Sequence, residues 1–312
     1  MQTAKFDNLD EIPILGLGTW LSKGNEVYVA VLEAIRIGYR HFDCAYIYRN
    51  EKEIGRALKD AMTAGLVKRE ELFITSKLWN SDHAPDRVEV AVRKSLHDLQ
   101  LDYLDLYLMH WPVAFKTKHE MANDASDLVS LDQMPLHVTW QAMEAIKLKG
   151  LTRHIGVSNF NIPKLKYLID RAVVKPEVNQ VELHPYFQQL ELVEFCKFNG
   201  ILVTAYSPLG SRHLMNSEAG LTQEKLILEI AKKHSCTVAQ VLLAWGMQRG
   251  TIVIPKSIHF ERIKENFESI YVNMNSTEIA EIDILERNLR MAKGAYCVLP
   301  NGCYTLKSIW EE

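Results

Sequence analysis

The sequence lacks any long apolar run. Among its 312 residues, no uncharged hydrophobic stretch approaches the roughly 18 residues that a membrane-spanning helix needs. The amino terminus has one lysine but no apolar stretch behind it, so a secretion signal is not expected. A strong net charge is lacking as well, because 36 lysines and arginines stand against 39 aspartates and glutamates. We therefore expect a cytoplasmic protein that binds neither membranes nor nucleic acid.

Cysteine is scarce and has no pairing pattern. The chain has five widely scattered cysteines: Cys44, Cys196, Cys236, Cys297 and Cys303. This odd number argues against a disulfide framework and for a reducing compartment. The spacing of metal ligands is lacking too. His119-Glu120 begins like the helix of a metalloprotease, but Asn123 stands where the second histidine is required, so no metal site is expected.

Short apolar runs alternate with amphipathic stretches along the whole chain. Eight apolar runs have the character of strands: residues 15–19, 41–43, 72–76, 103–109, 154–158, 178–181, 201–205 and 251–254. Between them, helices are predicted over residues 27–37, with Gly38 as the stop, and from Pro85 onwards, with one apolar stripe of Val88, Val92, Leu96 and Leu99. Eight such units without a linker predict an α/β fold, a single (β/α)₈ TIM barrel domain over residues 1–312.

Segments outside these units complete the predicted barrel. Residues 4–6 and 12–14 are short apolar segments ahead of the first strand, and they predict a small β-hairpin that closes the barrel floor. Three connections are too long for simple turns: residues 111–135, 207–222 and 289–312. Because barrel active sites lie at the carboxyl ends of the strands, we expect two of these loops to overhang a site at that mouth.

Four residues with acid–base chemistry follow neighbouring strands. Asp43, Lys77 and His110 end the second, third and fourth strands, and Tyr48 follows the second by a few residues. Taken singly, each has a structural interpretation: Asp43 and Lys77 as an ion pair, Tyr48 as an aromatic side chain at the rim, and His110 as a core histidine. Together at one mouth they indicate an active site. The ammonium of Lys77 is expected to lower the pKa of Tyr48, which would make this phenol a proton donor at neutral pH.

These residues lie in segments that resemble the aldo-keto reductase family. The matching segments span most of the chain: residues 38–45 with Tyr48 and 50–51, then 76–79, 103–112, 156–160 and 254–257. The resemblance implies a (β/α)₈ barrel that binds a nicotinamide cofactor without a Rossmann fold. It implies that Tyr48 is the general acid, that Lys77 and Asp43 tune it, and that His110 orients the substrate carbonyl.

The cofactor is expected to bind without the usual dinucleotide fingerprint. The stretch from Gly16 to Leu21 begins like that fingerprint, but Leu21 stands in place of its third glycine. By the resemblance, Ser158, Asn159 and Gln180 hydrogen-bond the carboxamide, and Tyr206 stacks on the nicotinamide ring. The resemblance places the following further residues on the cofactor: Gly18, Thr19, Trp20, Ser207, Leu209, Ser211, Ile254 and Pro255.

The adenosine end favours a phosphorylated cofactor. Lys256 and Ser257 close the last strand, and Arg262, Glu265 and Asn266 follow on the next predicted helix. An ammonium, a hydroxyl and a guanidinium suit a 2′-phosphate, whereas a ribose 2′-hydroxyl is usually bound by a carboxylate. The family places these five residues on that phosphate. NADPH is therefore the expected cofactor, with NADH left open as a second one.

The substrate is less well defined than the reaction. Trp20, Trp79 and Trp111 are expected to give the pocket apolar walls beside His110. Within the family, the chain is most similar to aldose and aldose-6-phosphate reductases, which implies an aldose, a sugar phosphate or a small aldehyde as substrate. Arg49, directly after Tyr48, leaves two alternatives open: it binds a sugar phosphate, or it faces solvent.

Two further expectations concern chemistry and assembly. Cys297 lies near the nicotinamide in one interpretation and is a buried, inert thiol in the other. A barrel that binds NADP(H) without catalysis is the alternative function, but such a protein has no need of all four residues at the strand ends. No heptad pattern or exposed apolar run is evident, so a monomer or a weak dimer is expected.

Overall fold

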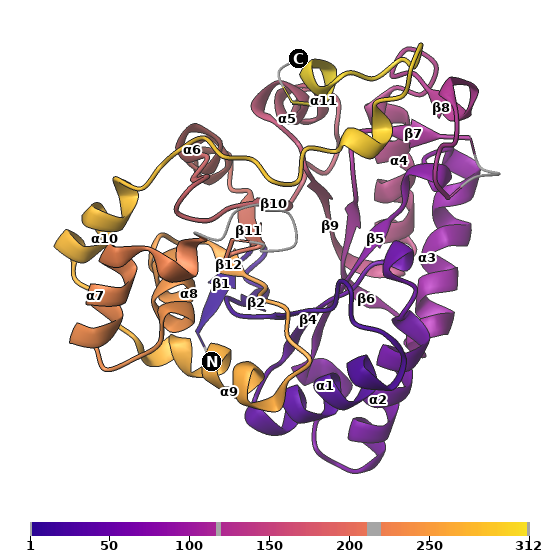
Figure 1. The fold of residues 1–312 in the computed structure, drawn as a ribbon. Coiled ribbons are helices and arrows are strands. Elements are labelled where there is room, and N and C mark those ends of the chain that lie inside the picture. Colours follow the sequence, from indigo (N-terminus) through magenta and orange to yellow (C-terminus); the bar gives the residue numbers. More distant parts are fainter. Residues whose placement is uncertain (1, 117–119, 211–219, 311–312) are drawn as a thin grey trace.

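Eight parallel strands form the centre of the computed structural model, which describes residues 2–116, 120–210 and 220–310 (Figure 1). In spatial order the strands are β3 (Leu17–Gly18), β4 (His41–Asp43), β5 (Phe73–Leu78), β6 (Leu104–Met109), β9 (Thr152–Ser158), β10 (Val178–Glu182), β11 (Leu202–Tyr206) and β12 (Ile252–Val253). Parallel bridges between Leu15 and Val253 and between Gly18 and Lys256 join the first unit to the last. The predicted α/β barrel is confirmed.

The joint between the first and last strands has few hydrogen bonds. Backbone amides of Gly16 and Gly18 donate to the carbonyls of Val253 and Pro255, at 2.9 and 3.0 Å. Gly18 has no room for a side chain, because a Cβ there would lie 2.8 Å from the carbonyl oxygen of Ile254. We call this joint the seam. Glycine at position 18 is what lets the two strands approach closely enough to close the sheet.

Helices cover the outside of the barrel (Figure 1). They are α1 (Gly24–Ile37), α2 (Glu51–Thr63), α3 (Pro85–Leu99), α4 (Leu136–Leu148), α5 (Ile162–Ile169), α6 (Leu190–Phe198), α7 (Lys225–Lys233), α8 (Val238–Gln248), α9 (Phe260–Glu268), α10 (Ser276–Asp283) and α11 (Leu306–Trp310). Gly38 ends α1 with a φ of 123°, and Pro85 begins α3, both as predicted. The predicted apolar stripe of α3 is buried. Helix α1 begins three residues earlier than expected, at Gly24.

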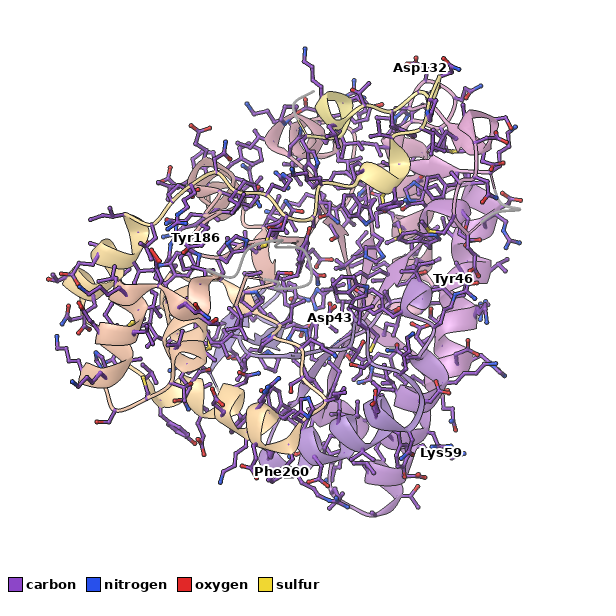
Figure 2. The ribbon with its side chains drawn as sticks, viewed as in Figure 1. Asp43, Tyr46, Lys59, Asp132, Tyr186 and Phe260 are labelled. Atoms are coloured by element: carbon purple, nitrogen blue, oxygen red, sulfur yellow. The ribbon has the colours of Figure 1, made fainter. Side chains whose placement is uncertain are left out.

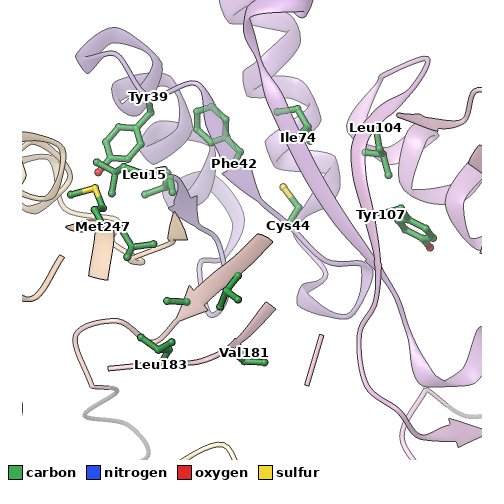
Figure 3. Close-up of a cluster of buried hydrophobic side chains, with 14 of the residues drawn as sticks. Leu15, Tyr39, Phe42, Cys44, Ile74, Leu104, Tyr107, Val181, Leu183 and Met247 are labelled. Carbon is green, nitrogen blue, oxygen red and sulfur yellow. The ribbon is translucent and has the colours of Figure 1, made fainter. Parts of the chain in front are cut away.

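Alternate side chains of the strands build two apolar layers. Phe42 and Ile74 belong to the large cluster between the sheet and the helices, part of which is drawn in Figure 3. Leu106 and Leu108 belong to a smaller cluster that also contains residues of the amino-terminal hairpin. Strands buried on both faces explain why their sequences are continuous apolar runs rather than alternating ones.

The amino-terminal hairpin closes the barrel as predicted. Strands β1 (Thr3–Lys5) and β2 (Glu11–Pro13) pair antiparallel, and the nearby side chains of Phe6 and Ile12 are buried in the smaller cluster. The ring of His154 stacks on Phe6 at 3.7 Å. Its two nitrogens contact carboxylates, Nε2 with Asp10 at 3.1 Å and Nδ1 with Glu177 at 2.8 Å. A buried histidine and two carboxylates therefore anchor the hairpin.

This anchor is expected to weaken in acid. Burial raises the pKa of Glu177, but hydrogen bonds with His154 and Lys147 lower it by more, so the net pKa is below its ordinary value. The stabilisation is then present above the unfolded-state pKa of about 4.3 and is lost as the pH falls through the folded pKa. Thermal unfolding between about pH 3 and 7 should show a smaller acid-dependent fall in Tm for Glu177→Gln than for the wild type. Parallel curves for the two proteins would contradict this.

Candidate active site

A cavity of about 710 Å³ opens at the carboxyl ends of the strands. All three long loops contribute to it, one more than expected, through Met121, Leu209 and Tyr296 among others. Figure 2 places Asp43 near the centre of the molecule, with Lys59 and Phe260 at the periphery. Most of the predicted site residues line this cavity: Gly18, Thr19, Trp20, Asp43, Tyr48, Trp79, His110, Trp111, Ser158, Asn159, Gln180, Tyr206, Ser207, Leu209, Ile254, Pro255, Lys256, Ser257 and Arg262.

A buried lysine connects the acid and the phenol. Lys77, on β5, is fully buried, and its Nζ donates to Asp43 Oδ1 at 2.5 Å and to the Cys44 carbonyl at 2.9 Å. The same Nζ donates to the hydroxyl oxygen of Tyr48 at 3.3 Å. Asp43 ends β4, the neighbour of β5, and Tyr48 closes the 3-10 helix Tyr46–Tyr48 that follows β4. Adjacent strands thus bring the three side chains together, as predicted.

Burial and charge act in opposite directions on the pKa values of this group. Burial opposes the charged form of Lys77, but the charges and hydrogen bonds of Asp43 and Tyr48 together outweigh burial and hold the pKa of the ammonium above its ordinary value. For Tyr48, burial raises the pKa, the Lys77 charge lowers it, and Asp43 raises it again. The net pKa of Tyr48 is raised, so the expected lowering is wrong in its net direction. The phenol therefore keeps its proton at neutral pH.

His110 lies next to the phenol. The rings of Tyr48 and His110 meet edge to face at 5.9 Å, and Trp79 packs against the same histidine at 5.2 Å. Burial, together with the Lys77 charge, holds the pKa of His110 well below its ordinary value. A neutral imidazole carries one N–H and can donate to an oxygen without adding a positive charge. Its Nδ1 is buried with no hydrogen-bond partner among the described residues.

Gln180 has a contact that the sequence did not predict. Its Nε2 donates to Asp43 Oδ2 at 2.6 Å, so both carboxylate oxygens of Asp43 accept hydrogen bonds. The two residues are 137 positions apart, on β10 and at the end of β4. Nε2 uses one of its two N–H groups in this contact, so the amide oxygen and the second N–H of Gln180 are left for a carboxamide ligand.

Polar groups beside β9 form a connected network. Asn159, in left-handed conformation with a φ of 64°, donates from Nδ2 to the His110 carbonyl at 2.9 Å and to Ser158 Oγ at 3.1 Å. The Tyr206 hydroxyl donates to Asn159 Oδ1 at 2.7 Å, and Ser158 Oγ donates to the Gln180 carbonyl at 2.8 Å. These contacts fix the Asn159 amide and the Ser158 hydroxyl on the wall of the cavity.

Only part of the residue set predicted to bind the 2′-phosphate belongs to the described lining of the cavity. Lys256, Ser257 and Arg262 line the cavity, and neither of the two cations makes an ion pair with another described residue. Glu265 and Asn266 are not among the described lining residues. Glu265 accepts a hydrogen bond from Thr237 at 2.6 Å, and Asn266 is 3% exposed. Both follow Arg262 on α9, at i+3 and i+4, so their assignment to the cofactor stays a prediction. Ser211 lies outside the described residues.

Aromatic side chains enclose the other end of the cavity. Trp79 and Trp111 are buried, whereas Trp20 is 42% exposed. Tyr296, in the carboxyl-terminal tail, stacks on Trp79 at 6.0 Å and meets the edge of Trp111 at 5.6 Å. Tyr296 could not be predicted from the sequence, because the tail carries no motif that marks it. Its neighbour Cys297 is buried, and burial raises the pKa of this thiol to about 12, in agreement with an inert cysteine.

Arg49 lies outside the described lining of the cavity. Its side chain is 70% exposed, and its guanidinium forms an ion pair with Glu120. Of the two interpretations left open by the sequence, this position agrees with a guanidinium that faces solvent. Among the described residues, no group of three His, Cys, Asp or Glu side chains is placed to hold a metal ion. None of the described helices is long and apolar enough to cross a membrane.

Comparisons with known proteins agree over nearly the whole chain. A model of the Aldo/keto reductase family matches residues 14–287. The chain is 46% identical to an aldo/keto reductase of Synechocystis sp., over 100% of this chain and 97% of that protein. It is 47% identical to aldo-keto reductase family 1 member A1 of Rattus norvegicus, over 90% of this chain and 88% of that protein. The structure of the aldose reductase from Schistosoma japonicum superposes with a TM-score of 0.88 and 42% identity, covering 95% and 96% of the two chains.

Proposed function

Since the chain belongs to the aldo/keto reductase family, we propose that it reduces the carbonyl of a small aldehyde or aldose with NADPH and takes the proton from Tyr48. The protein is an oxidoreductase of the aldehyde and aldose reductase type. The observation that carries the proposed mechanism is the position of Lys77 Nζ, 2.5 Å from Asp43 and 3.3 Å from the hydroxyl of Tyr48. Burying an ammonium is costly. A barrel that only bound cofactor would have no use for one directed at a phenol.

The side chains around the phenol have separate roles in this proposal. Tyr48 holds a proton at Oη and donates it to the carbonyl oxygen. Lys77 stabilises the phenolate that remains, and Asp43 keeps the ammonium charged and in place. His110, neutral at physiological pH, donates a hydrogen bond that orients and polarises the carbonyl. When bound, the reduced nicotinamide supplies the hydride for the carbonyl carbon.

The lining residues fit a phosphorylated dinucleotide. At one end, Ser158, Asn159 and the free amide oxygen of Gln180 offer partners for a carboxamide beside Tyr48. At the other end, Lys256 and Arg262 present two cations that no described carboxylate pairs with. Two cations without an ion-pair partner, together with the Ser257 hydroxyl, suit a 2′-phosphate. NADPH is the cofactor that this combination supports best.

Arg262→Ala should therefore weaken NADPH binding selectively. Loss of a charge-assisted hydrogen bond of about 1.5–3 kcal/mol corresponds to an increase of roughly 10- to 100-fold in the KM for NADPH. The KM for NADH, which has no 2′-phosphate, should change little. Lys264→Ala, an exposed cation on the same helix outside the described lining, is the matched control. Steady-state kinetics with both cofactors make the comparison, and an equal loss for NADPH and NADH would contradict the assignment.

The direct test of the function is oxidation of NADPH in the presence of D-glyceraldehyde, followed by the loss of reduced-nicotinamide absorbance. Turnover by the wild type is the expected result. Failure with glyceraldehyde and with other short aldehydes, in a protein that still binds NADPH, would favour the non-catalytic alternative.

We also propose that residues 1–312 act as one domain in the cytoplasm, as a monomer or a weak dimer, since the sequence carries neither a heptad pattern nor a long apolar run.

A further inference from the structure

The rim of the cavity beside Tyr48 carries an ion pair between two loops. Arg49 follows the 3-10 helix Tyr46–Tyr48 in left-handed conformation, with a φ of 57°. Glu120 belongs to the connection between β7 (Ala114–Phe115) and β8 (Leu128–Val129), and its Oε2 pairs with the Arg49 guanidinium. The only cation directly next to the phenol in sequence is thus compensated by a carboxylate from a different part of the chain.

Two further contacts hold Glu120 at the rim. The Tyr46 hydroxyl donates to Glu120 Oε1 at 2.6 Å, and Trp79 Nε1 donates to the backbone carbonyl of Glu120. Trp79 and Met121, the residue after Glu120, both line the substrate half of the cavity. The Glu120 side chain remains 33% exposed. Its charge therefore lies beside two residues that line the cavity, although Glu120 itself is not part of the described lining.

The described lining of the substrate half supplies no uncompensated positive charge. His110 is neutral, because burial and the Lys77 charge hold its pKa well below the ordinary value. The ammonium of Lys77 is paired with Asp43. Lys256 and Arg262 lie at the opposite end, where they are proposed to bind the cofactor. The remaining described walls are aromatic or aliphatic, with Trp111, Ile47 and Met121 among them, so they offer no side-chain cation to an anionic group on a substrate.

We propose that Glu120 is a specificity-determining residue that disfavours phosphorylated substrates and leaves neutral aldehydes as the substrate class. This inference rests on the proposed function. Glu120 acts in two ways. Its carboxylate pairs with the Arg49 guanidinium that a phosphate would need, and its negative charge repels an approaching dianion. An exposed ion pair is weak by itself, so removing the carboxylate should free Arg49 without disturbing the fold.

The test compares D-glyceraldehyde with D-glyceraldehyde 3-phosphate, which differ only by the phosphate group. The measured quantity is the phosphate-to-neutral ratio of kcat/KM with NADPH. The wild-type ratio should be below one, and Glu120→Gln should raise it by up to about fivefold, since glutamine keeps an acceptor for Tyr46 but removes the charge. Arg49→Gln should lower the ratio, because Glu120 is then uncompensated. The double variant should lose the gain of Glu120→Gln.

Three controls separate the possible outcomes. Glu89→Gln removes another ion-paired glutamate, one that contacts Lys149 and lies outside the described lining, and should leave the ratio unchanged. The gain of Glu120→Gln should shrink at high salt, because exposed charges are screened. NADPH binding, followed by fluorescence, checks that each variant is folded. A wild-type ratio of one or more, or equal changes for both substrates in Glu120→Gln, overturns the inference. No wild-type turnover of either substrate would instead overturn the proposed function.

Discussion

Tyr48→Phe is expected to lower kcat for aldehyde reduction about 10³-fold while the affinity for NADPH stays the same. The substitution removes the O–H that lies 3.3 Å from Lys77 Nζ, and the described residues offer no other proton donor between Lys77 and His110. The aromatic ring remains, so the packing against His110 at 5.9 Å is preserved. Steady-state kinetics give kcat, and quenching of protein fluorescence by NADPH gives the dissociation constant.

Tyr46→Phe is the matched control for this variant. Tyr46 lies on the same 3-10 helix, but its hydroxyl is bound to Glu120 rather than to Lys77. Its kcat for a neutral aldehyde should stay within a few-fold of the wild-type value. A Tyr48→Phe protein with full activity would show that the proton comes from elsewhere, and the mechanism would have to be abandoned.

The second large effect is expected at Lys77, where activity and stability should both fall. Lys77→Met replaces the ammonium by an apolar group of similar length. Asp43 is then left as a buried carboxylate without its cation, and breaking a buried pair in this way costs about 3–5 kcal/mol. Unfolding in urea should show this loss as a lower midpoint. Aldehyde reduction should fall with it, because no charge remains to stabilise the phenolate.

A double variant separates these two consequences. In Asp43→Asn/Lys77→Met the stranded charge is gone, so most of the stability should return. Activity should not return, because the ammonium is still absent. A double variant as unstable as Lys77→Met would show that the loss comes from packing. Recovery of activity in the double variant would show that the ion pair has no part in catalysis.

The sequence predicts the barrel and the contact of Asp43, Lys77 and Tyr48 because both follow from local patterns. Each strand is a short apolar run, and the residue that ends it faces the mouth whatever the rest of the chain does. Asp43 and Lys77 end adjacent strands, so their contact follows from strand order alone. The resemblance to the aldo-keto reductases rests on the same segments, and the family match confirms it.

Features that depend on distant parts of the chain could not be predicted in this way. The hydrogen bond from Gln180 to Asp43 crosses the inside of the barrel, and Tyr296 reaches Trp79 from a short 3-10 helix (Ala295–Cys297) in the carboxyl-terminal tail. The direction of the Tyr48 pKa shift depends on how completely the site is buried. The position of Arg49 depends on Glu120, which is 71 residues away and lies in a long loop. Sequence spacing carries no information on any of these contacts.

The seam has a consequence for the lifetime of the protein. Residues proposed to hold the cofactor lie on both of its sides, Gly18 and Thr19 on one and Pro255 and Lys256 on the other. A dinucleotide bound across the seam would oppose the separation of β3 from β12, and its binding free energy would add to that of closing the sheet. Resistance to proteolysis would then rise and fall with the supply of cofactor, so that a cell short of this dinucleotide, in either redox state, would also degrade this reductase faster.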